Sequence, residues 1–272
     1  MKKIVLALAV VLFVLNIGFK VDASSAELVT VIVDGRTIEF TDAPAYLDAN
    51  GRVQVPVRFV GEALGACVEW DESRNQATFA RRFNLFDSSR GEVTIVFTIG
   101  KKEFSVQPDR KSNAERKTMD TEAVVEQART YVPVRYLAEN LGATVSWDDA
   151  TRTVTVQSKT MAMGNFVIPE SYTDYVTHLD NSSVRGVRFD LDFNSNKKAG
   201  FESRKALLLH ILSQELGQAS LDIIDQFMKD HRYREPKDNL DHLRERFRDS
   251  QTGRQFGVVR FALNSFAVVV DD

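Results

Sequence analysis

Two stretches of the chain repeat the same order of hydrophobic and polar positions. Residues 51–56 (GRVQVP) and 128–133 (ARTYVP) alternate apolar and polar side chains, which predicts a strand. A proline ends each strand, and VRFVGEALG or VRYLAENLG follows with apolar positions three and four apart, as on one face of a short helix. Each stretch therefore predicts a strand followed by a short helix.

The same two stretches continue with a predicted hairpin. Gly65 and Gly142 are placed to end the helices in the left-handed conformation. VEW and VSW then predict a strand, DESRN and DDATR a polar turn, and QATFA and TVTVQ the returning strand. The copies are offset by 77 residues (133 − 56) and share at least ten identical positions, which indicates an internal repeat.

Each copy is too small to bury a core of its own, because about 40 residues is near the lower limit for independent folding. We therefore expect the two copies to form one pseudo-symmetric domain. The equivalent tryptophans, Trp70 and Trp147, lie two residues from a valine on the same strand face, and we expect them in the core. The alternative is that they are exposed platforms for sugar rings.

Other side chains of the repeat have structural explanations. Arg58 and Arg135 each begin a predicted helix and are expected to form ion pairs rather than to hold an anion; the acidic candidates are Glu62, Asp71, Glu139 and Asp148. The single cysteine, Cys67, cannot form an internal disulfide, and we expect a buried or half-buried inert thiol.

Residues 28 to 157 resemble the copper amine oxidase N-terminal-like domain family, also called the stalk domain, through the repeated VPVR…LGA.V.WD pattern. The resemblance implies an antiparallel sheet wrapped round short helices. It also implies a spacer or binding module of exported bacterial proteins that carries neither copper nor quinone, so no catalytic residue is carried over. Two segments depart from the family pattern, 80–92 and 107–122, and we expect them to be mobile or specialised loops.

The remainder, residues 165–272, resembles no family and predicts a compact α+β domain. Residues 184–194 alternate as a half-buried strand, 202–217 predict a helix closed by Gly217, and 220–231 predict a second helix. Residues 237–250 predict a third helix from the spacing of Leu240, Leu243 and Phe247. Residues 255–272 predict two strands that turn near Asn264 and Ser265.

This part of the chain holds weak candidates for a binding or metal site. Asp190 and Asp192, with Asn194 and Asn196, have the rhythm of a calcium loop, but Ser195 and Phe201 stand where an EF-hand needs glycine and glutamate.

Asp238 and His242 lie four apart on the predicted third helix, without the spacing of a zinc site. His178 and His231 are the further histidines that could join such a cluster, and His210 lies in an apolar helix. We expect no metal, no cofactor and no catalytic group.

The beginning of the chain predicts export. Lys2 and Lys3 precede a short apolar run and a small-residue exit, so residues 1–26 predict a signal peptide, with an uncleaved anchor as the weaker alternative. The chain has 35 basic and 38 acidic residues and no basic block, which argues against nucleic acid as a partner.

We therefore expect a non-enzymatic protein of the cell envelope or extracellular space, with a stalk domain at 27–158 and no membrane span after signal removal. The expected partner is a cell-wall component or another exported protein. The alternative is a secreted hydrolase or metalloprotein with its site in residues 165–272.

Overall fold

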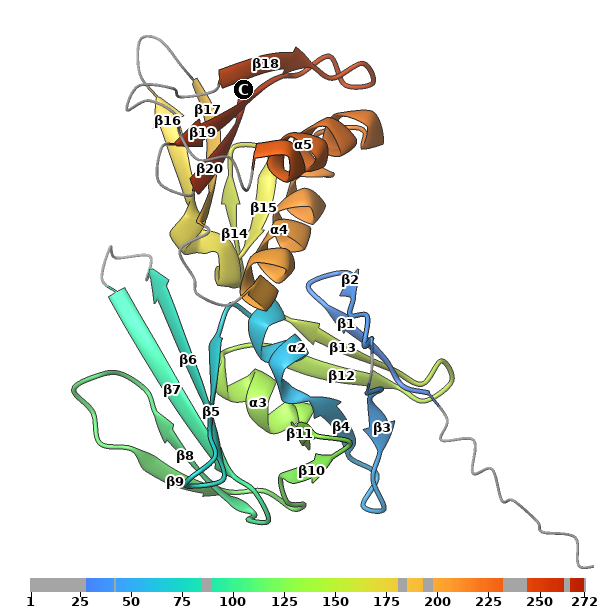
Figure 1. Ribbon diagram of the computed structural model, residues 1–272, viewed down its shortest axis with the longest axis vertical. Coiled ribbons are helices and arrows are strands. Elements are labelled where there is room, and N and C mark those ends of the chain that lie inside the picture. The colour runs from blue at the N-terminus through green and yellow to red at the C-terminus, as the bar shows by residue number, and fades with distance from the viewer. Residues whose placement is uncertain are drawn as a thin grey trace, which may run out of the picture.

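The computed structural model describes residues 28–41, 43–84, 90–180, 185–192, 198–231, 244–261 and 265–271. The predicted signal peptide lies outside these residues. Buried apolar side chains form two clusters, one drawn from residues 29–156 and the other from residues 166–270. Helices and strands are mixed and most strand pairs are antiparallel, so the protein is of the α+β class (Figure 1).

The two repeat copies contain the same elements in the same order. The first copy is built from β4 (Val53–Pro56), α2 (Val57–Ala63), β5 (Cys67–Asp71) and β6 (Gln76–Asn84). The second is built from β11 (Arg129–Pro133), α3 (Val134–Asn140), β12 (Thr144–Asp148) and β13 (Thr153–Gln157).

The proline and the glycine of each copy act as the sequence predicts. Pro56 and Pro133 are the N-caps of α2 and α3, where their fixed φ suits a helix start. Gly65 and Gly142 follow the two helices with φ of +79° and +86°, a conformation that a side chain disfavours.

The copies meet along their first strands. β4 pairs with β11 in antiparallel fashion, and Val55 lies opposite Val132, its equivalent in the repeat. A local two-fold axis therefore passes between these two residues. The first buried cluster contains side chains from both copies, among them Val60 and Leu137.

The remaining strands of this part extend three sheets. They are β1 (Thr30–Val33), β2 (Arg36–Thr37), β3 (Tyr46–Leu47), β7 (Arg90–Thr98), β8 (Glu103–Gln107), β9 (Glu115–Thr118) and β10 (Val124–Glu126). The sheet orders are β12-β13-β1-β2, β10-β11-β4-β3 and β5-β6-β7-β8-β9. Figure 1 shows α2 and α3 lying between the first and the last of these sheets.

Both segments that were expected to be loops contain strand residues. Residues 80–84 and 90–92 extend the β6–β7 hairpin, where Arg82 lies opposite Glu92. Within 107–122, Glu115–Thr118 form β9, an edge strand paired with β8. Its exposed, charged side chains suit an edge position, since charge discourages pairing with further strands.

The second part of the chain has its own sheet. Its elements are β14 (Thr160–Met163), β15 (Phe166–Pro169), the 3-10 helix η1 (Glu170–Tyr175), β16 (Val176–Asp180), β17 (Arg185–Asp192), α4 (Lys198–Leu212), α5 (Gln218–His231), β18 (Arg244–Arg248), β19 (Gln255–Phe261) and β20 (Ser265–Asp271). The sheet order is β16-β17-β20-β19-β18, with β14-β15 as a separate hairpin.

Three predictions for this part are confirmed and two are wrong. β17, α5 and the β19–β20 hairpin lie where the sequence predicts them. The predicted third helix is wrong over Arg244–Arg248, which is β18, because Phe247 stacks on Phe256 of β19 at 5.3 Å between ring centroids. The rest of that prediction, 237–243, lies outside the described residues. Gly217 does not close α4, which ends at Leu212.

No helix among the described residues is long and apolar enough to cross a membrane.

Candidate functional site

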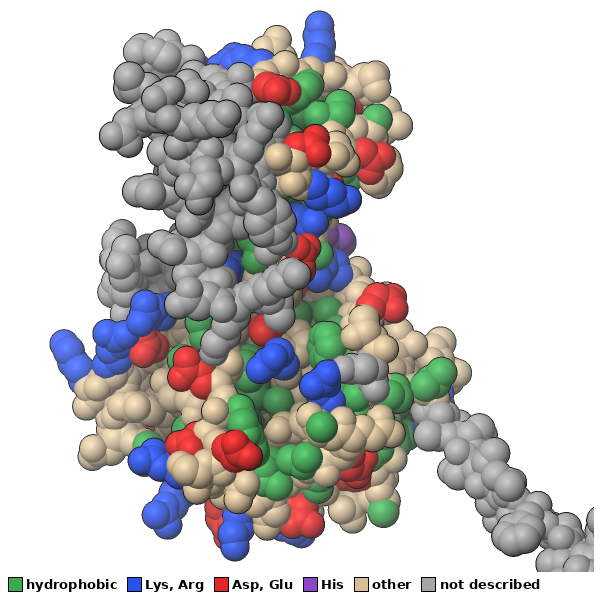
Figure 2. All heavy atoms as spheres, in the orientation of Figure 1, with side chains coloured by type: hydrophobic (Ala, Val, Ile, Leu, Met, Phe, Trp, Pro, Cys, Tyr) green, Lys and Arg blue, Asp and Glu red, His purple; other side chains and the backbone are tan. Residues whose placement is uncertain are grey.

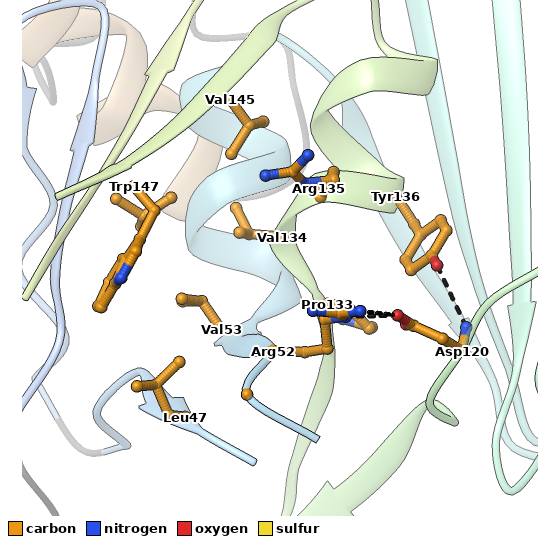
Figure 3. Close-up of a pocket in the computed structure, with 12 residues that line it drawn as sticks. Leu47, Arg52, Val53, Asp120, Pro133, Val134, Arg135, Tyr136, Val145 and Trp147 are labelled. Atoms are coloured by element: carbon orange, nitrogen blue, oxygen red, sulfur yellow. Dashed lines mark hydrogen bonds and ion pairs between the residues drawn. The ribbon is translucent and has the colours of Figure 1, made fainter. Parts of the chain in front are cut away.

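A pocket of about 370 Å³ opens between the two repeat copies (Figure 3). The β3–β4 hairpin lines one part of it, and the end of β11, α3, β12 and β13 of the second copy line another. Asp120, between β9 and β10, completes the lining. The pocket therefore exists only when both copies are in place.

One wall of the pocket is apolar. Val53, Val134 and Val145 form its middle in Figure 3, with the indole of Trp147 beside them. The Trp147 Nε1–H donates to Asp149 at 3.3 Å, and the Arg152 guanidinium lies 5.8 Å from the centre of the ring. These two contacts hold the indole in position at the edge of the pocket.

The other wall is polar. The Arg52 guanidinium donates to the Asp120 carboxylate, and the Asp120 backbone N–H donates to the Tyr136 hydroxyl oxygen at 3.2 Å. Hydrogen bonding from Arg52 holds the pKa of Asp120 below its ordinary value, so this carboxylate stays ionised. Arg135, nearby, lies 3.9 Å from Glu139. Arg52 and Asp120 were not predicted from the sequence, because 68 residues separate them and no local pattern connects them.

The predicted burial of the tryptophans is wrong for Trp70, which is 43% exposed. Trp147 is half-buried against the first core cluster. Val68 is buried on the same strand face as Trp70, so the face was predicted correctly. The tryptophans lie near the ends of their strands, where less of the neighbouring structure covers them.

Two further predictions for the repeat have different outcomes. The expected ion pairs are present at Arg58–Glu62, 4.0 Å, and Arg135–Glu139, 3.9 Å. The aspartates instead bind their own turns, Asp71 through Ser73 and Asp148 through Thr151. Cys67 is exposed rather than buried, because Val68 takes the inward position of β5. The Cys67 side chain lines a charged groove together with Arg82, Glu92 and Arg110.

Arg81 connects three parts of the molecule. It lies on β6 of the first copy and is 1% exposed. Its Nη1 donates to the Leu141 carbonyl at the end of α3 in the second copy, and its Nη2 lies 2.7 Å from the Glu170 carboxylate of η1. The equivalent of Arg81 in the second copy is Ser158, so the repeat is broken at this position. An arginine at an inward-facing position, two residues from the buried Phe79, was the sequence signal that could have identified Arg81 as a buried contact residue.

A second contact joins the same two parts of the chain. The Arg36 Nη1 donates to the Ser203 carbonyl of α4 at 3.3 Å. His210 of α4 lies against Gly35, where an added Cβ would be 3.2 Å from its Nε2. Burial lowers the pKa of His210, which favours the neutral ring. His210 is half-buried on α4, and the structure places it in the contact between the two parts of the chain.

Of the candidates for a cluster in the C-terminal part, only Asp190 and His178 have side chains that the structure describes. Asp190 is held by Arg188, which donates to it at 2.6 and 2.9 Å, and lies on β17 as a strand residue. His178 is exposed on β16. The backbone of Asp192 lies in β17, but its side chain is outside the description, as are that of His231 and all of Asp238 and His242.

A copper centre does not fit the described residues. Copper oxidase centres use histidine ligands, and residues 32–156 contain no histidine. Within the described part of the chain, no group of three or more His, Cys, Asp or Glu side chains is placed to hold a metal ion.

Figure 2 shows charged side chains of both signs interspersed on the face in view.

Asp249 is a buried carboxylate that no pattern in the sequence predicted. It accepts hydrogen bonds from the Gly217 N–H at 2.8 Å, the Ser220 hydroxyl at 2.6 Å and the Thr252 N–H at 2.6 Å. These donors, the Ser220 hydroxyl first, hold its pKa well below the ordinary value. Asp249 therefore ties the start of α5 to the turn between β18 and β19.

Comparisons with known proteins recognise the first part of the chain. Comparison with curated proteins gave no match, and comparison with solved structures gave none either. The C-terminal half matches no family model. Residues 32–156, a little under half of the chain, match the model of the copper amine oxidase N-terminal domain.

Proposed function

We propose that the protein is a non-enzymatic exported protein of the cell envelope or extracellular space. In this proposal residues 27–158 act as a spacer or adaptor, and residues 165–272 bind a cell-wall component or another exported protein. The observation that carries the proposal is the Arg81 contact, which fastens the C-terminal part to both repeat copies at once.

Such a contact suits an adaptor because it fixes orientation. A buried ion pair is costly to break, so the two parts stay in one arrangement rather than move on a loose linker. The Arg36 hydrogen bond to Ser203 and the packing of His210 against Gly35 add a second point of attachment. A binding surface on the C-terminal part would thus be held at a set distance and angle from the rest of the chain.

A pulldown tests this proposal. The purified protein is incubated separately with isolated cell wall and with culture-medium proteins, and an unrelated exported protein of similar charge serves as the control. We expect retention on the wall or capture of an exported partner. Passage through both fractions without retention would contradict the proposal, and release of soluble wall fragments would favour the hydrolase alternative.

A metal and turnover assay tests the non-enzymatic part. The purified protein is dialysed, analysed for metal and then supplied with copper and an amine. We expect neither retained stoichiometric copper nor peroxide formation. Copper that survives dialysis together with amine-dependent peroxide would place a catalytic centre in residues 165–272.

A further inference from the structure

We propose that the pocket between the repeat copies binds a neutral pyranose ring, with Trp147 and the adjoining valines against the apolar face of the sugar and the Arg52–Asp120 pair hydrogen-bonded to its hydroxyls. This goes beyond the proposed function, since the pocket lies in the family-matched region and not in the C-terminal part.

The charges of the pocket favour a neutral ligand. Each arginine at its rim has an acidic neighbour: Arg52 binds Asp120, and Arg135 lies 3.9 Å from Glu139. An anion would have to compete with these carboxylates, and a cation with the guanidinium groups. A neutral ligand can hydrogen-bond to both members of the Arg52–Asp120 pair without displacing either.

The two walls favour a ring with one apolar face and a polar edge. Trp147 and the valines offer planar and aliphatic surface, whereas Arg52, Asp120 and Tyr136 offer donors and acceptors across the pocket in Figure 3. A wholly apolar ligand would desolvate the polar wall without giving it partners. A pyranose has C–H groups on its face and hydroxyls at its edge, so it can pack against the apolar wall and hydrogen-bond to the polar wall.

The size of the pocket and the difference between the repeat copies also favour a sugar ligand. About 370 Å³ lies at the small end of ligand pockets, which suits one or two sugar rings. In the first copy the equivalent of Tyr136 is Phe59, whose ring contacts Phe40 at 5.5 Å between centroids. The hydroxyl that joins the polar wall is thus a feature of the second copy alone.

The two tryptophans of the chain make the test direct. In a Trp70→Phe variant of the full chain, Trp147 is the only fluorescent indole. We expect its emission to change saturably on titration with soluble β-1,4-linked glucose or N-acetylglucosamine oligosaccharides. In the matched Trp147→Phe variant the Trp70 emission should not change.

A second set of variants tests the polar wall. Asp120→Asn and Arg52→Gln, made in the Trp70→Phe chain, should each weaken sugar binding by at least about tenfold, the range expected for the loss of a charged hydrogen-bonding partner. Arg74→Gln is the control, because Arg74 is exposed and pairs only loosely with Asp71 at 3.6 Å.

Three results would overturn the proposal. One is the absence of any saturable change with either sugar series; another is an equal change in the Trp147→Phe variant. The third is binding of an apolar dye such as anilinonaphthalene sulfonate, displaced by no sugar. None of these results depends on wall retention, so failure here is distinguishable from failure of the proposed function.

Discussion

At the scale of single residues, equivalent positions of the repeat have different surroundings. Trp70 is 43% exposed, whereas Trp147 is half-buried beside the pocket and against the core. The difference arises because the β3–β4 hairpin lies beside Trp147 and contributes Leu47 to the same pocket.

The tryptophans should therefore differ in their effect on stability. Loss of a fully buried Trp costs about 3 to 5 kcal/mol, so we expect Trp147→Ala to cost about 2 kcal/mol and Trp70→Ala less than about 1 kcal/mol in the free energy of unfolding. Urea unfolding measures both. Equal losses near the fully buried value would show that both rings are core residues.

Asp249 predicts a loss of stability in acid. Its pKa in the folded state is lowered, so its contribution is complete above the unfolded pKa, about 4, and is lost as the pH falls toward the folded value. Asp249→Asn should cost about 3 kcal/mol near neutral pH, since buried donors lose a charged acceptor.

Urea unfolding at several pH values below about 5 separates this effect from a general one. The Asp249→Asn variant should lose less stability in acid than the parent. Asp222→Asn is the control, because Asp222 is exposed on α5 and accepts from Gln218. An unchanged pH dependence in Asp249→Asn would contradict the prediction.

At the scale of the elements, the ends of the two repeat helices converge on η1. A Cβ added to Gly65 would lie 2.9 Å from the Ser171 carbonyl oxygen, and one added to Gly142 would lie 3.7 Å from the Glu170 carboxylate. The glycines were predicted as helix ends, and they also face this contact with the C-terminal part.

The two glycines offer a matched pair of substitutions. Each alanine suffers the left-handed backbone conformation, which costs about 1 to 2 kcal/mol. Gly142→Ala should cost only this amount. Gly65→Ala should cost distinctly more, because the backbone of Ser171 must also shift. Thermal unfolding compares the two, and identical melting temperatures would contradict the contact at Ser171.

At the scale of the whole molecule, Arg81 is expected to set how strongly the parts are coupled. Arg81→Met leaves Glu170 without its buried partner and should destabilise by about 3 to 5 kcal/mol. Its neighbour Arg82 is exposed and pairs with Glu92, so Arg82→Met is the control and should change stability little.

Calorimetry and limited proteolysis give the readout for Arg81. We expect the Arg81→Met variant to unfold in separate steps and to be cut more rapidly between the two parts, near residues 157–170. The Arg82→Met variant should behave as the parent does. If both variants unfold alike, Arg81 does not couple the parts.

A fragment tests whether the repeat copies depend on each other. Residues 80–158 lack β4, α2 and β5, which supply Val55 and Val60 to the common core. The fragment should therefore be unfolded or aggregated, as judged by circular dichroism and thermal melting. A cooperative transition from the fragment alone would contradict this prediction.

The sequence by itself determined the local features of this protein. The Pro56 and Gly65 ends of a helix, their equivalents in the second copy, and the alternation of β17 each follow from rules that act within a few residues. The resemblance of the first part to the copper amine oxidase N-terminal domain also follows from the repeated motif, and the family model matches residues 32–156.

Only the tertiary structure decided the rest, because these features depend on contacts between distant residues. Arg244–Arg248 is a strand because Phe247 finds Phe256 on a neighbouring strand. Arg81 is buried because Leu141 and Glu170 supply acceptors 60 or more residues away. The pocket likewise needs Arg52 and Asp120 side by side. Local propensity contains no information on such pairings, since their free energy arises only when the chain has folded.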